Sequence, residues 1–192
     1  MTRDDLLKMI QSRAARTCIG PSTVRGRGNA GAVEAARIFL RRLNLAPFGV
    51  IDSTCFQTQL NRTTEDLRKA LPRGCQYWGM ARKILNIFLL DCFYTSYLAS
   101  AFHLDRAESF FELPLDSITA KELRRAAKKR DISLPPWPGV KHLTMPASAS
   151  FQKAAADEAS MLRMARVHLD AFWWSVSRDA DTAEQLIQPE RE

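Results

Sequence analysis

The fold of this chain is decided by the stretch Leu71–Leu90, which reads LPRGCQYWGMARKILNIFLL. It opens with a Leu-Pro step and contains two glycines, and from Lys83 onward its apolar residues cover most sides of a helix. A helix that is apolar nearly all round is buried, so we expect this one to be central. Burial disfavours the charged form of a lysine. Lys83, on the first turns of that helix, is therefore the first candidate for chemistry.

Helical patterns also fill the rest of the chain, and no segment of useful length alternates apolar and polar residues with period two. The expected helices cover residues 3–15, 31–43, 52–61, 63–71, the stretch from the turn at 73–79 to about Phe102, 105–111, 116–130 and 150–178. Between them lie a glycine-rich basic loop at 17–31 and a proline-rich segment at 131–149 around Trp137. We therefore predict one compact all-α domain over residues 1–192.

The composition is that of a soluble globular protein with an excess of cations. The chain has 192 residues, of which 46% are hydrophobic and 26% charged, and its net charge is +7. Such an excess favours a polyanionic partner, with nucleic acid first, although a merely basic surface is an equal reading of charge alone.

The cysteines indicate neither a metal site nor a disulfide framework. None of the four forms a C-x-x-C pair, so no metal or other cofactor is expected, and Cys55, Cys75 and Cys92 are expected to be small core residues. The N-terminus MTRDDLLKMI lacks the apolar core of a signal peptide, and polar residues interrupt the apolar run 84–102. We expect a cytoplasmic protein without a membrane span.

Short sequence motifs link the central helix to the segment 113–117. Leu71-Pro72, Gly74 and Gly79 precede Ala81-Arg82-Lys83 and Asn86, and Leu-Pro-Leu-Asp-Ser follows at 113–117. Over roughly residues 52–125, this series resembles the helix-hairpin-helix, Gly/Pro-rich loop and aspartate signature of the DNA glycosylase superfamily. Two features depart from the usual pattern. The residues CQYW at 75–78 lengthen the hairpin, and 33 residues separate Lys83 from Asp116.

That long interval is most similar to the archaeal 8-oxoguanine DNA glycosylase branch. The resemblance implies a two-lobed helical fold with a divergent helix-hairpin-helix. It also implies that Lys83, as a neutral amine, attacks the sugar C1′ and forms a Schiff base, which β-elimination can follow. Asp116 would cap a helix, stay ionised and stabilise the cationic sugar. If Lys83 cannot reach the sugar, Asp116 could instead guide a water.

A base must leave the duplex before its glycosidic bond can be reached, and the distorted backbone must then be held. The candidates for contacts to the DNA backbone are Arg25, Arg27, Arg73, Gly74, Gly79 and Arg82. The candidates for the base pocket or for a wedge are Gln57, Gln59, Tyr77, Trp78, Asp170 and Trp174. Each has a plainer reading: Lys83 can extend from the core to solvent, Asp116 can be only a cap, and Asp170 can pair with Arg166 or Arg163.

The sequence therefore favours a monomeric DNA glycosylase that acts on a modified base in double-stranded DNA. An oxidised purine and a hypermodified base of the kind that phages use both fit. Two alternatives stay open. One is a non-catalytic helical DNA-binding protein that keeps the hairpin scaffold. The other is a helical adaptor for proteins, whose basic surface is incidental.

Overall fold

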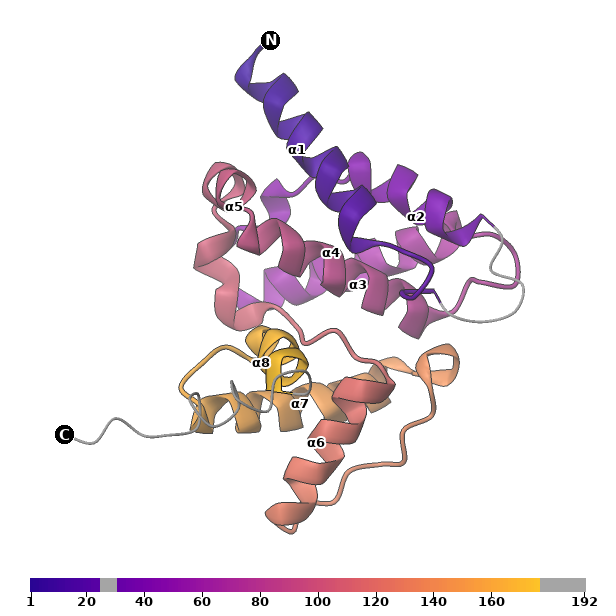
Figure 1. Ribbon diagram of the computed structural model, residues 1–192, viewed down its shortest axis with the longest axis vertical. Coiled ribbons are helices and arrows are strands. Elements are labelled where there is room, and N and C mark those ends of the chain that lie inside the picture. The colour runs from indigo at the N-terminus through magenta and orange to yellow at the C-terminus, as the bar shows by residue number, and fades with distance from the viewer. Residues whose placement is uncertain (25–30, 177–192) are drawn as a thin grey trace, which may run out of the picture.

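The computed structural model describes residues 1–24 and 31–176, and this part of the chain forms helices and no β-strand (Figure 1). The α-helices are α1 (Arg3–Cys18), α2 (Ala32–Arg41), α3 (Ser53–Ala70), α4 (Trp78–Tyr94), α5 (Ser96–Phe102), α6 (Ser117–Lys129), α7 (Met145–Met161) and α8 (Leu169–Val176). Four short 3-10 helices join them: η1 (Ala46–Phe48), η2 (Leu104–Phe110), η3 (Val140–His142) and η4 (Arg166–His168). The predicted all-α class is confirmed.

Helix α4 is the central element, as its apolar sequence predicts. It packs against α1, α2, α3, α5, α7 and η3. Ile84, Leu85 and Phe88 are completely buried. At its first turn, a Cβ on Gly79 would lie 2.3 Å from the carbonyl oxygen of Val140, so only glycine lets η3 approach this closely. Gly74, in the turn before α4, has a φ of +86°, a backbone conformation that glycine adopts without strain.

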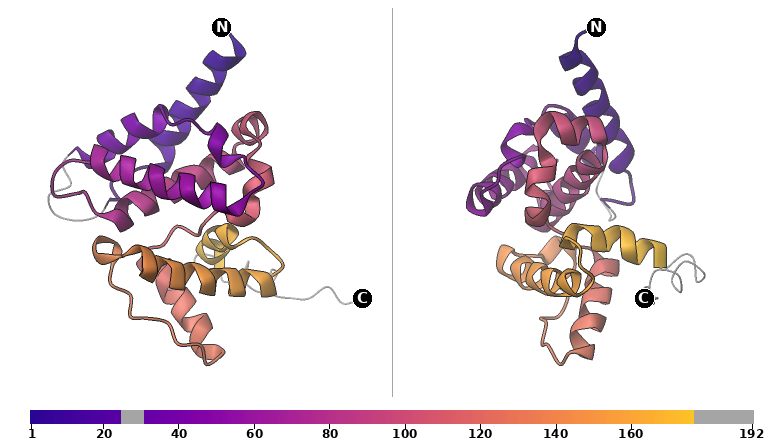
Figure 2. Two further views of the ribbon diagram at one scale, coloured as in Figure 1. Left: turned by 180° about the vertical axis from the view of Figure 1, so that it is seen from behind. Right: turned by 90° about the vertical axis from the view of Figure 1, so that its left-hand side faces the viewer.

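The buried apolar residues form two clusters, and those of α4 belong to the first. The first cluster lies among α1 to α5 and η2, and the second among α6, α7 and α8. Figure 1 and both views of Figure 2 place α6, α7 and α8 together on one side of the helices α1 to α5. The segment from η2 to Asp116 connects the two groups. Any side chain that leaves α4 toward α6 therefore crosses from one cluster to the other.

Two predicted helix boundaries near α4 are wrong. The separate helices expected at 52–61 and 63–71 are one helix, α3, in which the hydroxyl of Thr64 donates a 2.7 Å hydrogen bond to the carbonyl of Leu60. The long helix expected to reach Phe102 breaks at Thr95, whose backbone is extended, and α5 continues at an angle of 96° to α4. No single described helix is long and apolar enough to cross a membrane; only this bent pair passes on length and composition.

The predicted last helix at 150–178 is also wrong. Helix α7 begins earlier, because Thr144 caps its first turn, and it ends at Met161. The chain then turns through Arg163, which has a positive φ, and α8 begins at Leu169. Arg166 fixes the turn by donating hydrogen bonds to the carbonyls of Phe110 and Phe111, 3.0 and 2.9 Å away.

The cysteine prediction holds for two of the three residues expected to be buried. Cys75 and Cys92 are buried, and burial raises the pKa of the Cys92 thiol. Cys55 is exposed, so its assignment to the core is wrong. It lies in the first turn of α3, where its backbone N–H donates to the capping carboxylate of Asp52.

Candidate active site

Lys83 and Asp116 meet across the boundary between the two clusters. The Lys83 ammonium nitrogen lies 3.2 Å from Oδ2 of Asp116, and the two side chains are 11% and 29% exposed. Lys83 stands on the second turn of α4, and Asp116 is the residue immediately before α6. The structure thus brings together the two residues that the sequence singles out, although 33 residues separate them in the chain.

The local fold holds the Asp116 carboxylate in place. Its Oδ1 accepts hydrogen bonds from the backbone N–H groups of Ile118 (2.8 Å) and Thr119 (3.1 Å), and the Asp116 N–H donates to the Thr119 hydroxyl. Just upstream, the amide side chain of Gln152 bonds both the N–H and the carbonyl of Leu113. Oδ1 is therefore committed to the helix cap, while Oδ2 faces Lys83.

The pair opens into a cavity of about 620 Å³. The volume lies within the range for small-molecule sites. The wall is mixed: Met80, Ile87, Trp137 and Val140 provide apolar surface, and Ser22, Thr23, Lys141, His142 and Asp170 provide polar groups. Trp137 is held edge-on against Phe151 of the second cluster, with the ring centroids 5.3 Å apart. The cavity thus combines a flat aromatic side chain with cationic and anionic groups.

Asp170 faces the same cavity from α8. Burial and the nearby charge of Asp116 raise its pKa to about 6, and the charge of Lys83 opposes this rise. The alternative in which Asp170 pairs with Arg166 or Arg163 is wrong. Arg166 bonds backbone carbonyls, and no described side chain forms an ion pair with Asp170. A carboxyl group that is partly protonated near neutral pH therefore stands beside the Lys83–Asp116 pair.

Replacing Asp170 with asparagine should stabilise the protein, and the gain should grow with pH. In the folded state the carboxyl binds its proton up to about pH 6, whereas its ordinary pKa is 3.8. Between these values the folded state holds more protons, so the free energy of unfolding falls as pH rises. We expect Asp170→Asn to gain roughly 2–3 kcal/mol over the wild type by pH 7 and little near pH 4.

Urea unfolding of both proteins from pH 4.5 to 8 measures this difference. Asp157→Asn is the control, because Asp157 belongs to an exposed pair with Lys153 on α7. A difference between Asp170→Asn and the wild type that stays constant with pH would contradict the burial of an ionisable Asp170.

Two of the predicted contacts to the DNA backbone are wrong. Arg82 is only 3% exposed. Its guanidinium lies 3.2 Å from the Glu112 carboxylate, donates to the Thr64 hydroxyl and also binds the side chain of Asn61. Gly79 is covered by Val140 and Leu143, so its backbone cannot approach a phosphate.

The other predicted backbone contacts are either exposed or outside the described residues. Arg73 and Gly74 are exposed in the turn between α3 and α4. Arg25 and Arg27 lie outside the described residues, and so does the side chain of Trp174 in α8. Ser22 and Thr23, which precede Arg25, do reach the cavity, and sequence reasoning missed them. The only signal for them in the sequence is their place within the glycine-rich loop at 17–31.

The predicted pocket residues of α3 do not reach the cavity. Gln57 donates hydrogen bonds to Asn61 and Glu112, and Gln59 donates to Thr63. The assignment of both glutamines to the pocket is therefore wrong, because α3 directs Gln57 into the Glu112 network and pairs Gln59 with its own next turn.

Tyr77 and Trp78 border a second groove of about 480 Å³. Lys141 and His142 line both this groove and the cavity of about 620 Å³, so the two hollows adjoin. The Lys141 ammonium lies 5.5 Å from the centre of the Tyr77 ring, and the Arg82 guanidinium lies 4.9 Å from that of Trp78. Neither aromatic residue lines the cavity itself.

Comparisons with protein-family models, with curated proteins and with solved structures find no match to this chain. Among the described residues, no three His, Cys, Asp or Glu side chains are grouped so that they could hold a metal ion.

Proposed function

We propose that this protein is a DNA glycosylase that excises a modified base and uses Lys83 as its nucleophile. One observation carries the proposal: a nearly buried amine and a helix-capping carboxylate meet 3.2 Å apart at a cavity of about 620 Å³. The net charge of +7 favours a polyanionic substrate. The arrangement of α3, a glycine-containing turn, α4 and a capped α6 supports the resemblance to the helix-hairpin-helix DNA glycosylases. The two apolar clusters fit the two lobes that this resemblance implies.

The chemistry begins with loss of a proton from the Lys83 ammonium. Oδ2 of Asp116 is positioned to accept it. The free amine then attacks C1′ of the extruded nucleotide, a C–N bond forms, and the glycosidic bond breaks with its electron pair leaving on the base. The new C1′ amine loses a proton and O4′ gains one, so the C1′–O4′ bond breaks and the Schiff base forms. A base, the Asp116 carboxylate or water, then takes a C2′ proton, a C2′–C3′ double bond forms, and the C3′–O bond breaks with its electron pair leaving on the 3′-phosphate, which cuts the strand. In its protonated form, Asp170 would donate a hydrogen bond to the base, because it lines the same cavity and its pKa is raised to about 6.

The cavity wall suits a flat, polar ligand. Trp137 offers an aromatic surface for stacking, and His142 and Asp170 offer polar groups for the edges of a base. An oxidised purine and a hypermodified base both present such a combination of a flat ring and polar substituents.

A second function rests on the same pair. Lys83 and Asp116 tie α4 to α6, so a non-catalytic DNA-binding protein would also keep them as a structural link between the two clusters. One experimental outcome distinguishes the two functions: only the glycosylase forms a covalent bond to DNA.

Borohydride trapping distinguishes them. The purified protein is incubated with duplexes that carry 8-oxoguanine, an abasic site or hypermodified pyrimidines, in the presence of sodium borohydride, and an unmodified duplex is the control. We expect a covalent protein–DNA adduct with at least one modified duplex and none with the control. Salt-dependent binding without any adduct or base release would favour the non-catalytic protein. If the protein shows no salt-dependent DNA binding, the remaining alternative is the helical adaptor for proteins.

A further inference from the structure

The exposed face of α6 carries a row of basic side chains. Its buried face is formed by Thr119, Ala120, Leu123 and Ala127. The basic residues on the other sides of the helix are Lys121, Arg124, Arg125, Lys128 and Lys129. The one acidic side chain within α6 is Glu122. We call these five basic residues the α6 basic face.

The described part of the protein neutralises almost none of the positive charge of the α6 basic face. Arg125 makes one long ion pair, 3.7 Å, with Glu122, and the Arg125 side chain is 70% exposed. The other four cations form no ion pair or hydrogen bond with a described residue. Arg130, the next cation, differs: it pairs with Glu158 at 2.8 Å and ties α6 to α7. Like charges three or four residues apart destabilise a helix, so an anion bound to this face would relieve their repulsion.

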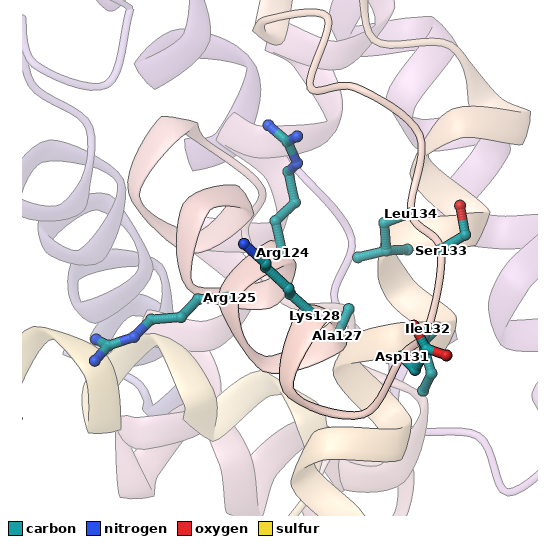
Figure 3. Close-up of a pocket in the computed structure, with 8 residues that line it drawn as sticks. All are labelled: Arg124, Arg125, Ala127, Lys128, Asp131, Ile132, Ser133 and Leu134. Atoms are coloured by element: carbon teal, nitrogen blue, oxygen red, sulfur yellow. The ribbon is translucent and has the colours of Figure 1, made fainter.

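A groove runs along one side of the face. It has a volume of about 550 Å³, and its walls are the C-terminal half of α6 and the segment 131–134 (Figure 3). Figure 3 shows that Arg125 extends away from this segment, while Ser133 and Leu134 lie opposite the helix. Arg124, Arg125 and Lys128 line the groove with one carboxylate, that of Asp131, so its charge is positive.

The basic face begins at the candidate active site. Ser117 and Ile118, in the first turn of α6, line the cavity that holds Lys83 and Asp116. Residues three or four apart share a face of a helix, so this face continues through Lys121, Arg125 and Lys128. At about 1.5 Å per residue, Lys121 lies about 6 Å and Lys128 about 17 Å along the axis from Ser117. The α6 basic face therefore extends along the helix axis away from the cavity.

We propose that the α6 basic face binds the phosphate backbone of the DNA that flanks the extruded nucleotide. The proposal rests on the glycosylase function. From Lys121 to Lys128 the face is about 10 Å long, which matches the axial rise of about three nucleotide steps of one strand at about 3.4 Å each. The face has no aromatic residue, whereas the centres of protein interfaces are rich in aromatic anchors. Charge and composition thus favour a nucleic acid over an acidic protein.

Two triple variants of equal charge test this proposal. The first variant removes three charges of the α6 basic face, with Lys121→Gln, Arg125→Gln and Lys128→Gln. The matched control removes three exposed cations from α1, with Arg3→Gln, Lys8→Gln and Arg16→Gln. Fluorescence anisotropy measures the Kd of each protein for a 30-base-pair duplex with a central abasic site, from 50 to 300 mM KCl. Borohydride trapping of the wild type on the same duplex is measured in parallel.

We expect the α6 variant to bind at least about tenfold more weakly at 100 mM KCl, with a salt slope smaller by about 2–3. The α1 variant should bind like the wild type. Equal binding by both variants, or equal weakening of both, would overturn the proposal while wild-type trapping leaves the glycosylase function standing. If the wild type neither traps nor binds, the glycosylase function itself fails.

Discussion

Replacing Lys83 with alanine should abolish borohydride trapping and slow base release by about 10³-fold or more. The amine is the nucleophile in the proposed reaction, and no other described lysine forms an ion pair with Asp116. Binding should change much less, because Lys83 is 11% exposed and offers little charge to the DNA backbone. The measurements are single-turnover rates of base release, the yield of trapped adduct and the Kd for the same duplex.

The matched control is Lys153→Ala. Lys153 also pairs with an aspartate, Asp157, at 3.1 Å, but this pair lies exposed on α7 and away from the cavity. The control should trap and excise at the wild-type rate. Thermal unfolding of both variants separates chemistry from folding, since loss of the Lys83–Asp116 link can also lower stability. An adduct that still forms on Lys83→Ala would assign the nucleophile to another residue.

The sequence predicts those parts of the site that a short pattern of neighbouring residues indicates. Asp116 is recognisable as a cap because Pro114 breaks the chain and a helical pattern follows. The burial of α4 follows from its apolar run. Lys83 is recognisable because a cation on the first turns of a buried helix is rare. Their meeting is not a local property. The resemblance to the glycosylases predicted it, and the structure places the two groups 3.2 Å apart.

Arg82 shows where local signals fail. It is adjacent to Lys83 in sequence, yet about 100° separates neighbouring residues around a helix. On a helix buried on most sides, the pattern does not tell which cation faces a cavity and which faces the core. The answer depends on Glu112, 30 residues downstream, whose carboxylate meets the Arg82 guanidinium inside the protein.

The helix breaks that the sequence missed are also fixed by distant contacts. The turn between α7 and α8 is held by His168 as well as by Arg166. His168 lies 2.7 Å from the Glu108 carboxylate and 2.8 Å from the Tyr94 hydroxyl. These partners are 60 and 74 residues away in sequence. Within 150–178 itself the pattern stays helical, so tertiary contacts override it.

Replacing Glu112 with glutamine should destabilise the protein by about 3–5 kcal/mol. The substitution keeps a polar side chain beside Asn86 and Gln57 but leaves the Arg82 guanidinium buried without an opposite charge. Burial already lowers the pKa of Arg82, and the Glu112 carboxylate is the charge that opposes this fall. Urea unfolding at pH 7 measures the loss. Glu122→Gln is the control, because its partner Arg125 is 70% exposed, and it should cost no more than about 1 kcal/mol.

A double variant, Arg82→Met with Glu112→Leu, separates the cost of an unpaired charge from the value of the pair. Replacing both partners with apolar residues removes the Arg82 charge together with the carboxylate, so stability should recover in part relative to Glu112→Gln. Recovery should be incomplete, because the half-buried Arg166, whose pKa Glu112 raises against the effect of burial, and the Asn86 amide still lose this partner. Arg82→Met alone should lower stability strongly. A guanidinium that touched DNA would give the opposite pattern: Arg82→Met would weaken DNA binding and leave the free energy of unfolding unchanged. That result would place Arg82 on the surface and contradict the packing of α4 against α3.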